Sequence, residues 1–413
     1  MKKAAIISMI LSTILLIGKI GYAQDEPCTC TTDLDFLDKK IRKAPSFKKN
    51  RAAYLTYLSE VREISKRLSS DYDCFVLLNK VMLKINDNHS KVYGVDNGAI
   101  DKIRNNPERL NDFKNSELFN NYPLPRMDLD SLKRSLETKA LEDIEGIYEK
   151  GNRMSIGVFF IEEENHFQAI VLESDFPVWQ VGEIIYTLVP YGNNYLMNVG
   201  GDIESKRMIA YTERIEMGFF LTMGFQKDIT KTNYSLSIYA DSTYVRQELS
   251  SEITYLKIGS FNSWYPTLSD AESFYKSLVG TLSKPHLIID LRDNGGGGDR
   301  NSTLLLEIIN EYLKENQVYL LTNHRTASNA EQFVFKLQDK ENVRVVGART
   351  NGTVVYELKG DNYVLPSNNF VAVFTSKSHK RFMKIESMGI EPDVKFSMQN
   401  DWLDQLVKFI HQG

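Results

Sequence analysis

The most constraining feature of this chain is a regular alternation of strand-like and helix-like segments in its C-terminal part. Short apolar runs predict strands, and the amphipathic segments between them predict helices. The predicted strands cover residues 253–258, 286–291, 318–321 and 343–346. Because parallel strands need a crossover connection, usually a helix, the alternation favours a largely parallel sheet. We therefore expect an α/β domain over residues 251–413.

The residues before this domain show two other patterns. Between residues 24 and 95, apolar side chains recur every three or four positions, which predicts a helical N-terminal domain. Its predicted buried positions are Leu58, Val61, Ile64, Leu68, Phe75, Leu78, Met82 and Ile85. Residues 96–145 are polar and predict a connecting segment that is partly helical, with a helix near residues 128–141.

Residues 146–250 carry a β pattern with few helical segments. Short apolar or alternating runs separated by turn sequences predict an antiparallel β domain, either a sandwich or a small barrel. The predicted strands cover residues 154–162, 167–172, 182–189, 194–199, 217–224 and 234–239. The whole chain is therefore expected to be a multidomain protein that combines α+β and α/β architecture.

The first 23 residues have the layout of a secretory signal peptide. Met1-Lys2-Lys3 is basic, residues 4–17 are uncharged, and small residues precede Gln24; this order is typical of such peptides. The apolar run is shorter than the roughly 20 residues that a membrane helix needs. We expect residues 1–23 to be removed and the protein to be periplasmic or extracellular. The alternative is a retained anchor, since Lys19 closely follows the run.

Charge and hydropathy limit the partners of the mature chain. Loss of Lys2, Lys3 and Lys19 with the signal peptide takes the formal charge from −4 to −7. A negative charge argues against nucleic acid as a partner, because phosphate binding needs a basic surface. No later segment has a comparable apolar run, so we expect no integral membrane segment in the mature chain.

The three cysteines favour one disulfide bond. Export would place the chain in an oxidising compartment, and Cys28 and Cys30 precede the helical pair that contains Cys74. A bridge from Cys28 or Cys30 to Cys74 is expected, with one thiol left over. A metal site is the weaker interpretation because the spacing supplies no recognisable fourth ligand. We therefore expect no metal.

Ser328 is the candidate nucleophile. It lies between the strand at 318–321 and a helix that starts near Asn329. A hydroxyl there is close to the positive end of the helix, where free backbone N–H groups point outward. This position suits a nucleophile beside part of an oxyanion hole. The structural alternative is an ordinary helix cap, with Glu331 as the capping-box partner of Ser328.

Four glycines follow the strand at 286–291 almost directly, in Asp293-Asn294-Gly295-Gly296-Gly297-Gly298. Glycines allow backbone N–H groups to approach a substrate closely. We expect Gly295, Gly296 and Asn329 to supply the N–H donors of an oxyanion hole. A flexible turn is the structural alternative, and a phosphate loop is disfavoured because no Gly-Lys-Ser/Thr sequence ends the run.

Taken together, the motifs resemble those of the C-terminal processing (tail-specific) and tricorn peptidases, serine peptidase family 41. In order, they are the glycine run, Thr326-Ala327-Ser328-Asn329-Ala330-Glu331, Val345-Val346-Gly347 and Gly389-Ile390-Glu391-Pro392-Asp393. The resemblance covers roughly residues 253–400 and, more weakly, residues 30–95. It implies that Ser328 is the nucleophile and that the C-terminal domain has a ClpP/crotonase-like ββα spiral.

One departure from the family bears on the mechanism. The processing proteases activate their serine with a lysine 25 positions later, and that position holds Thr353, which cannot act as the base. The tricorn branch uses a histidine before the core and a glutamate ahead of a Gly-x-x-Pro-Asp motif. His89 and Glu386 match these two positions, although Asn88 stands where the tricorn pattern has a serine. Alone, neither residue would stand out from ordinary structural side chains.

The resemblance implies a serine-type endopeptidase that needs no metal, nucleotide or other cofactor and acts on polypeptide substrates. His89 would take the proton of Ser328 as the hydroxyl attacks a peptide carbonyl, and Glu386 would orient this pair or stabilise its charge. The rival hypothesis is a catalytically inactive relative that binds a ligand or peptide, and an esterase with the same groups is a third. The sequence predicts no oligomeric state.

Overall fold

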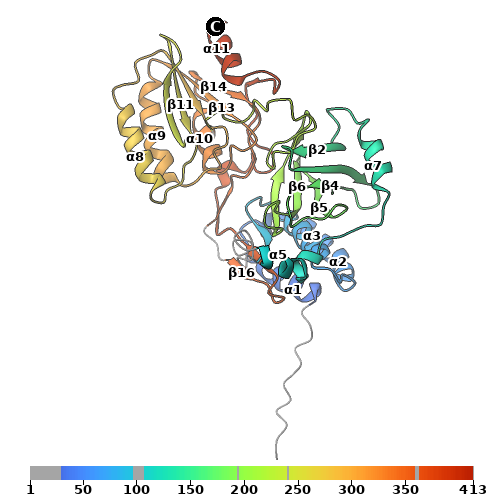
Figure 1. The fold of residues 1–413 in the computed structure, drawn as a ribbon. Coiled ribbons are helices and arrows are strands. Elements are labelled where there is room, and N and C mark those ends of the chain that lie inside the picture. Colours follow the sequence, from blue (N-terminus) through green and yellow to red (C-terminus); the bar gives the residue numbers. More distant parts are fainter. Residues whose placement is uncertain (1–28, 96–106, 193–194, 240, 359–361, 413) are drawn as a thin grey trace, which may run out of the picture.

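The computed structural model describes residues 29–95, 107–192, 195–239, 241–358 and 362–412. Cys28 and the segment predicted to be a signal peptide lie outside these ranges. Figure 1 shows blue helices at one end of the molecule, a green sheet next to them, and an α/β unit in yellow to red. Within the described ranges, no helix combines the length and apolar character needed to cross a bilayer.

The α/β unit is built on a six-stranded sheet in the order β10-β11-β12-β13-β14-β19. All neighbours from β11 to β19 are parallel, as the alternation of strands and helices predicts, and β10 is antiparallel at one edge. The strands are β10 (Tyr244–Glu248), β11 (Ile253–Ile258), β12 (His286–Asp290), β13 (Gln317–Thr322), β14 (Val343–Gly347) and β19 (Val394–Lys395).

Helices cover both faces of this sheet. Leu287 and Ile289 pack in one cluster with α8, α9 and α10, whereas Ile288 between them packs with Trp402 of α11. Burial on both faces explains why the strands read as continuous apolar runs. The helices are α8 (Thr267–Leu278), α9 (Asp299–Tyr312), α10 (Asn329–Leu337) and α11 (Trp402–Gln412).

The green sheet is a six-stranded antiparallel meander in the order β2-β3-β4-β5-β6-β7. It is a single layer, and helix α3 rather than a second sheet packs against it, with the hydroxyls of Tyr72 and Thr187 3.1 Å apart. The strands are β2 (Gly146–Lys150), β3 (Met154–Ile161), β4 (His166–Ser174), β5 (Ile184–Tyr191), β6 (Tyr195–Gly201) and β7 (Met208–Glu213), followed by the hairpin β8 (Ile215–Glu216) and β9 (Phe219–Phe220).

The N-terminal helices share one hydrophobic core with this sheet. Tyr72 and Phe75 on α3 are buried beside strand residues such as Ile185 and Val199. The two regions that the sequence separates are therefore joined by a common core; we call them together the N-terminal unit. Its helices are α1 (Cys30–Ile41), α2 (Phe47–Ser65), α3 (Asp71–Leu83), α5 (Pro107–Lys114), α6 (Glu117–Asn120) and α7 (Leu129–Leu136).

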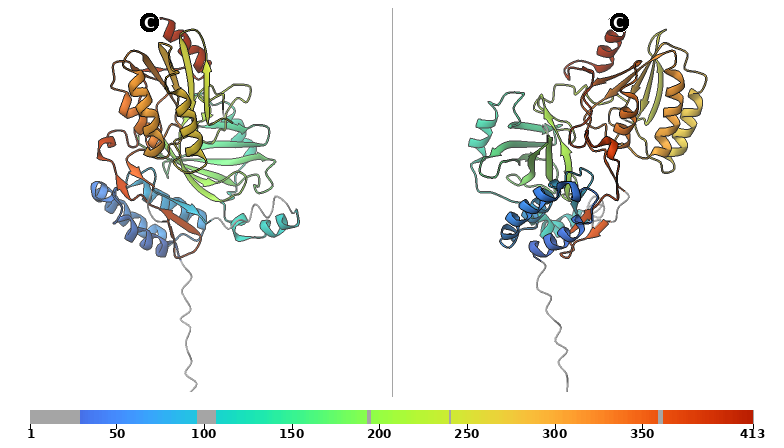
Figure 2. Two further views of the ribbon diagram at one scale, coloured as in Figure 1. Left: turned by 90° about the vertical axis from the view of Figure 1, so that its left-hand side faces the viewer. Right: turned by 180° about the vertical axis from the view of Figure 1, so that it is seen from behind.

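Strands from late in the chain also join the N-terminal unit. β1 (Lys91–Gly94) pairs with β17 (Phe370–Val373), which pairs with β16 (Asn362–Val364), all antiparallel. In both views of Figure 2 the orange-red strands lie beside the blue helices. The expected domain over residues 251–413 is thus interrupted. The chain leaves this domain after β15 (Tyr356–Glu357) and returns with β18 (Lys377–Ser378), which pairs with β15. The 3-10 helix η1 (Lys380–Phe382) follows.

Several local predictions are wrong. Residues 234–239 form no strand, because their backbone groups bond to side chains of the α/β unit: Arg292 donates to the carbonyls of Tyr234 and Leu236. Of residues 217–224 only the two of β9 are extended, and the helix expected to reach residue 141 ends at Leu136. Ile64 is 47% exposed rather than buried. Conversely, the sequence patterns did not predict β7 and β10.

Cys30 is bonded to Cys74, which is one of the two pairings that the sequence leaves open. The bond joins the start of α1 to α3 across 44 positions. Replacing both cysteines by alanine should lower the free energy of unfolding by about 3 kcal/mol, because a loop of this length restricts the unfolded chain. Urea unfolding measures the loss. Reductant should reproduce it in the wild type and change nothing in the variant; equal stability of all four samples would contradict the prediction.

Candidate active site

Ser328 occupies a strained turn between β13 and α10. Its backbone has φ 56° and ψ −120°, a combination that residues other than glycine rarely adopt. Gly296 lies directly against this turn with φ +99°, and a Cβ at Gly296 would come within 2.7 Å of the carbonyl oxygen of Ala327. Such a sharp strand-to-helix turn presents the side chain of a nucleophile at the end of a sheet.

His89 lies next to this serine. Its Nε2 is 3.2 Å from Oγ of Ser328, across 239 positions of sequence, so the hydroxyl can donate to the imidazole. Nδ1 of His89 is buried and has no hydrogen-bond partner among the described residues. Burial, and to a lesser extent the charge of Lys91, lowers the pKa of His89 to about 3. The ring is therefore neutral near pH 7 and free to accept a proton at Nε2.

The turn that carries His89 is fixed by Asp87. The carboxylate accepts hydrogen bonds from the N–H groups of His89 and Ser90 at 3.1 and 3.2 Å. It also accepts one from the hydroxyl of Thr375 at 2.6 Å. Thr375 follows β17 closely, so the late strand that joins the N-terminal unit also helps to hold the histidine.

Glu386 makes its hydrogen bonds to backbone N–H groups rather than to the side chains of His89 or Ser328. One carboxylate oxygen accepts from Asn88 at 3.1 Å, and the other accepts from Val354 and Val355 at 2.9 and 2.8 Å. Glu386 therefore ties the histidine turn to the loop that contains Thr353. Any action on the pair passes through the peptide group of Asn88.

The peptide group and side chain of Asn88 are held from three directions. Besides the bond from its N–H to Glu386, its side-chain amide donates to the carbonyl of Gly352 at 3.0 Å. The ammonium of Lys91 donates to the carbonyl of Asn88. Lys91 is buried, and burial lowers its pKa to about 8 against the opposing charges of Asp87 and Glu386. Neither pattern nor resemblance pointed to Lys91; its only sequence signal is its place two residues after His89.

Buried Glu331 organises the nucleophile turn. Its carboxylate accepts from the N–H of Ser328 at 3.1 Å, as its expected place at a helix cap requires. It also accepts from the N–H groups of Gly352 and Thr353 at 2.7 and 2.9 Å and from the hydroxyl of Thr350 at 2.6 Å. Burial raises the pKa of Glu331 to about 7. The sequence suggested the cap but not this second set of contacts.

The expected oxyanion donors differ from one another in the structure. Asn329 is the first residue of α10, so its N–H has no acceptor within the helix, and Gly295 is exposed. Both line the same cleft as Ser328. Gly296 departs from the prediction because its N–H donates to the side-chain oxygen of Asn294 at 2.9 Å. Its contribution is the close backbone approach described above.

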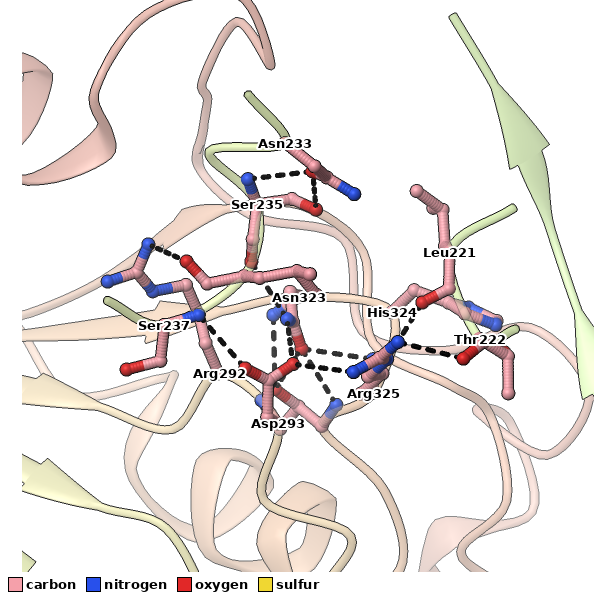
Figure 3. A network of polar contacts seen from close by, with 12 residues as sticks. Leu221, Thr222, Asn233, Ser235, Ser237, Arg292, Asp293, Asn323, His324 and Arg325 are labelled. Atoms are coloured by element: carbon pink, nitrogen blue, oxygen red, sulfur yellow. Dashed lines mark hydrogen bonds and ion pairs between the residues drawn. The ribbon is translucent and has the colours of Figure 1, made fainter. Parts of the chain in front are cut away.

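A polar network fixes the loops that lead into the site (Figure 3). The side-chain oxygen of Asn323 accepts from the N–H of Asp293 at 3.1 Å, and its amide donates to the carbonyl of Ser235 at 2.8 Å. Arg325 donates to the carbonyl of Leu221 at 2.8 Å. The ends of β12 and β13 are therefore held by the irregular segment that follows β9.

The cleft in front of Ser328 has a volume of about 860 Å³ and lies between the two units. The N-terminal unit contributes His89, Lys91 and Tyr211 to its walls, and the α/β unit contributes Asp299 and Gln332 among others. No group of three His, Cys, Asp or Glu side chains among the described residues could hold a metal ion. At Ser328 the site offers a hydroxyl beside a neutral imidazole.

The buried carboxyl of Glu386 should make stability fall as pH rises. Burial raises its pKa from 4.5 to about 8, so between these values the folded protein holds a proton that the unfolded chain has released. The contribution of Glu386 to the free energy of unfolding should therefore decrease from pH 5 to pH 9. Glu386→Gln should flatten this decrease by about 3 kcal/mol. Urea unfolding at both pH values tests this, with exposed Glu137→Gln expected to keep the wild-type slope; an unchanged slope in Glu386→Gln would refute it.

Comparison with known proteins finds a family match within the α/β unit. Residues 252–314 and 307–396 match the model of peptidase family S41, and no curated protein sequence matches the chain significantly. Three solved structures are similar: a lipoprotein from Streptococcus agalactiae (11% identity, 94% of this chain and 98% of that one, TM-score 0.36), the photosystem II D1 C-terminal processing protease (13%, 92% and 97%, 0.39) and the tricorn protease (12%, 93% and 37%, 0.38). Identities and scores this low carry no argument about activity. The family match confirms the resemblance of the motifs: the part of the chain that carries Ser328, the glycine run and Glu386 matches the model of peptidase family S41.

Proposed function

We propose that this protein is a serine-type endopeptidase that hydrolyses polypeptides with Ser328 and His89. One observation carries the proposal: Nε2 of His89 lies 3.2 Å from Oγ of Ser328, within an open cleft. A nucleophile and its base need this separation. The low pKa of His89 leaves the base unprotonated at neutral pH, and the strained turn aims the hydroxyl into the cleft.

The reaction follows from these positions. Oγ of Ser328 attacks the peptide carbonyl while His89 takes its proton, and the tetrahedral oxyanion accepts hydrogen bonds from the N–H groups of Asn329 and Gly295. His89 then protonates the leaving amine, which leaves an acyl-enzyme on Ser328. Water attacks the ester with His89 again as base, and the second product leaves with a new carboxyl group.

Glu386 serves this mechanism as a positioning residue. It accepts a hydrogen bond from the N–H of Asn88 and so holds the turn of His89 against the loop that contains Thr353. The carbonyl of Thr353 in that loop accepts the N–H of Ser328. Thr353 offers no base, so the proposed mechanism is the tricorn-like one. The ClpP/crotonase-like spiral and the domain limits given by the sequence stay predictions.

The disulfide bond, the cleft and the net charge support proposals about location and partners. The bond between Cys30 and Cys74 is of a kind that persists in oxidising compartments, which supports export to the periplasm or beyond. The volume of the cleft supports extended polypeptide segments as substrates. The negative net charge of the chain argues against nucleic acid as a partner.

A fluorophosphonate probe tests the proposal directly, because it labels only an activated serine. The wild-type protein should be labelled at Ser328, which mass spectrometry of the digested protein identifies, and Ser328→Ala should remain unlabelled. Equal labelling of the two proteins would refute the assignment.

A binding protein without catalytic activity is the second candidate. The observation that favours it is Nδ1 of His89, which is buried without a hydrogen-bond partner among the described residues, whereas a working triad orients this atom. In that case neither protein would react with the probe, yet both would bind peptide with equal affinity.

A further inference from the structure

Trp264 is an exposed indole inside the cleft. It is 79% exposed and lines the same cleft as Ser328, whereas Trp179 and Trp402 are only 5% and 0% exposed. An indole offers a large and rigid contact surface with few rotatable bonds. Its location in the cleft, rather than its exposure alone, makes it a candidate contact for a ligand.

The backbone around Trp264 is fixed to the glycine run. The N–H of Phe261 donates to the carbonyl of Gly296 at 2.9 Å, and the N–H of Gly298 donates to the carbonyl of Phe261 at 2.8 Å. The hydroxyl of Ser263 donates to the carbonyl of Gly298 at 3.0 Å. The segment that carries the indole is therefore anchored to the loop that carries the proposed oxyanion donor.

Few large apolar side chains among the described residues of the cleft are exposed. Among the large apolar side chains that are exposed in the described residues, two line it, Trp264 and Leu358. Polar or charged side chains such as Asn262, Asp299 and Gln332 form much of the remaining wall. Of these two, the indole is the more exposed, at 79% against 57% for Leu358, and so offers a bound polypeptide an accessible apolar contact.

We propose that Trp264 is a specificity residue, which packs against a bulky apolar side chain of the substrate next to the bond that is cut. The inference rests on the proposed peptidase function and adds a substrate class to it: polypeptides with an aliphatic or aromatic residue at that place. A charged residue there would lose the contact and part of its hydration. The neighbouring Tyr265 is 65% exposed but outside the cleft, which makes it a matched control.

Binding can be measured without turnover. In Ser328→Ala protein, Trp264 is the exposed tryptophan, so its emission should move to shorter wavelength when a peptide covers it. The probes are ten-residue peptide libraries with one fixed central residue, Phe, Leu or Asp. The Phe and Leu libraries should shift the emission and bind about 10-fold more tightly than the Asp library. The signal should vanish in Ser328→Ala/Trp264→Phe protein.

Hydrolysis provides the second measurement. Trp264→Ala should raise KM for Phe and Leu peptides about 10-fold and leave KM for the Asp peptides within twofold, because only the apolar side chain loses a partner. Trp264→Phe should recover most of the loss, and Tyr265→Ala should behave as the wild type.

The outcomes separate this inference from the proposed function. Hydrolysis with the same preference in wild type and Trp264→Ala would overturn the role of Trp264 and leave the peptidase standing. An emission shift with apolar libraries but no hydrolysis by the wild type would support the contact and refute the peptidase. Binding reported by the anisotropy of labelled libraries, without any change in tryptophan emission, would overturn the contact, as would no binding at all.

Discussion

Replacement of Ser328 by alanine should lower kcat/KM for peptide hydrolysis by about 10⁵-fold. In the proposed mechanism this hydroxyl forms the covalent bond to the substrate. No other hydroxyl in the turn replaces it, because that of Thr326 donates to the carbonyl of Leu291. Initial rates with a fluorogenic peptide that the wild type cleaves measure the loss. Activity within 100-fold of the wild type would contradict the assignment.

Ser328→Gly provides the matched control for folding. It should lose as much activity as the alanine variant, yet it should unfold at a higher urea concentration. A glycine adopts φ 56° without strain, which should stabilise it by about 1 kcal/mol relative to alanine. Loss of activity in a protein that is more stable cannot be attributed to misfolding.

Replacement of His89 by alanine should lower kcat by about 10⁴-fold and change KM little, since the imidazole acts on the proton of Ser328 and not on substrate binding. The control is His379→Ala. His379 lines the same cleft, but its Nε2 lies 2.7 Å from a carboxylate oxygen of Glu357. This variant should keep at least a third of the activity. Similar losses in both variants, or a loss below 10-fold in His89→Ala, would contradict the role of His89.

The parts of the fold that the sequence predicts correctly are those determined by local pattern. The central strands β11, β12 and β13 are apolar because both faces of the sheet are covered, and α10 starts at Asn329 because Ser328 and Glu331 form a cap. The segment at 234–239 was assigned wrongly for the opposite reason. Its apolar alternation is real, but its carbonyls bond to Arg292 and Asn323, and no local pattern shows such distant partners.

The residues of the candidate site were likewise predicted only in part. Motif order and family resemblance suggested Ser328, His89 and Glu386, and the structure places the first two in contact. It gives Glu386 an indirect place, and it adds Lys91 and Glu331 to the site. Lys91 donates to the carbonyl of Asn88, three positions before it. Glu331 acts through backbone groups of a loop distant in sequence, such as the N–H of Gly352, 21 positions later. A bond of this kind leaves no trace in residue spacing.

The pairing of β1 with β17 determines when the candidate site can form. His89 is held by Thr375 through Asp87 and by Glu386 through Asn88, and the last of these contacts spans 298 positions. A ribosome must therefore synthesise almost 300 further residues before the histidine can settle against the serine. Under the proposed mechanism an unfinished chain would therefore be inactive, and a truncation before β17 should abolish activity even where the serine and its cleft wall are intact.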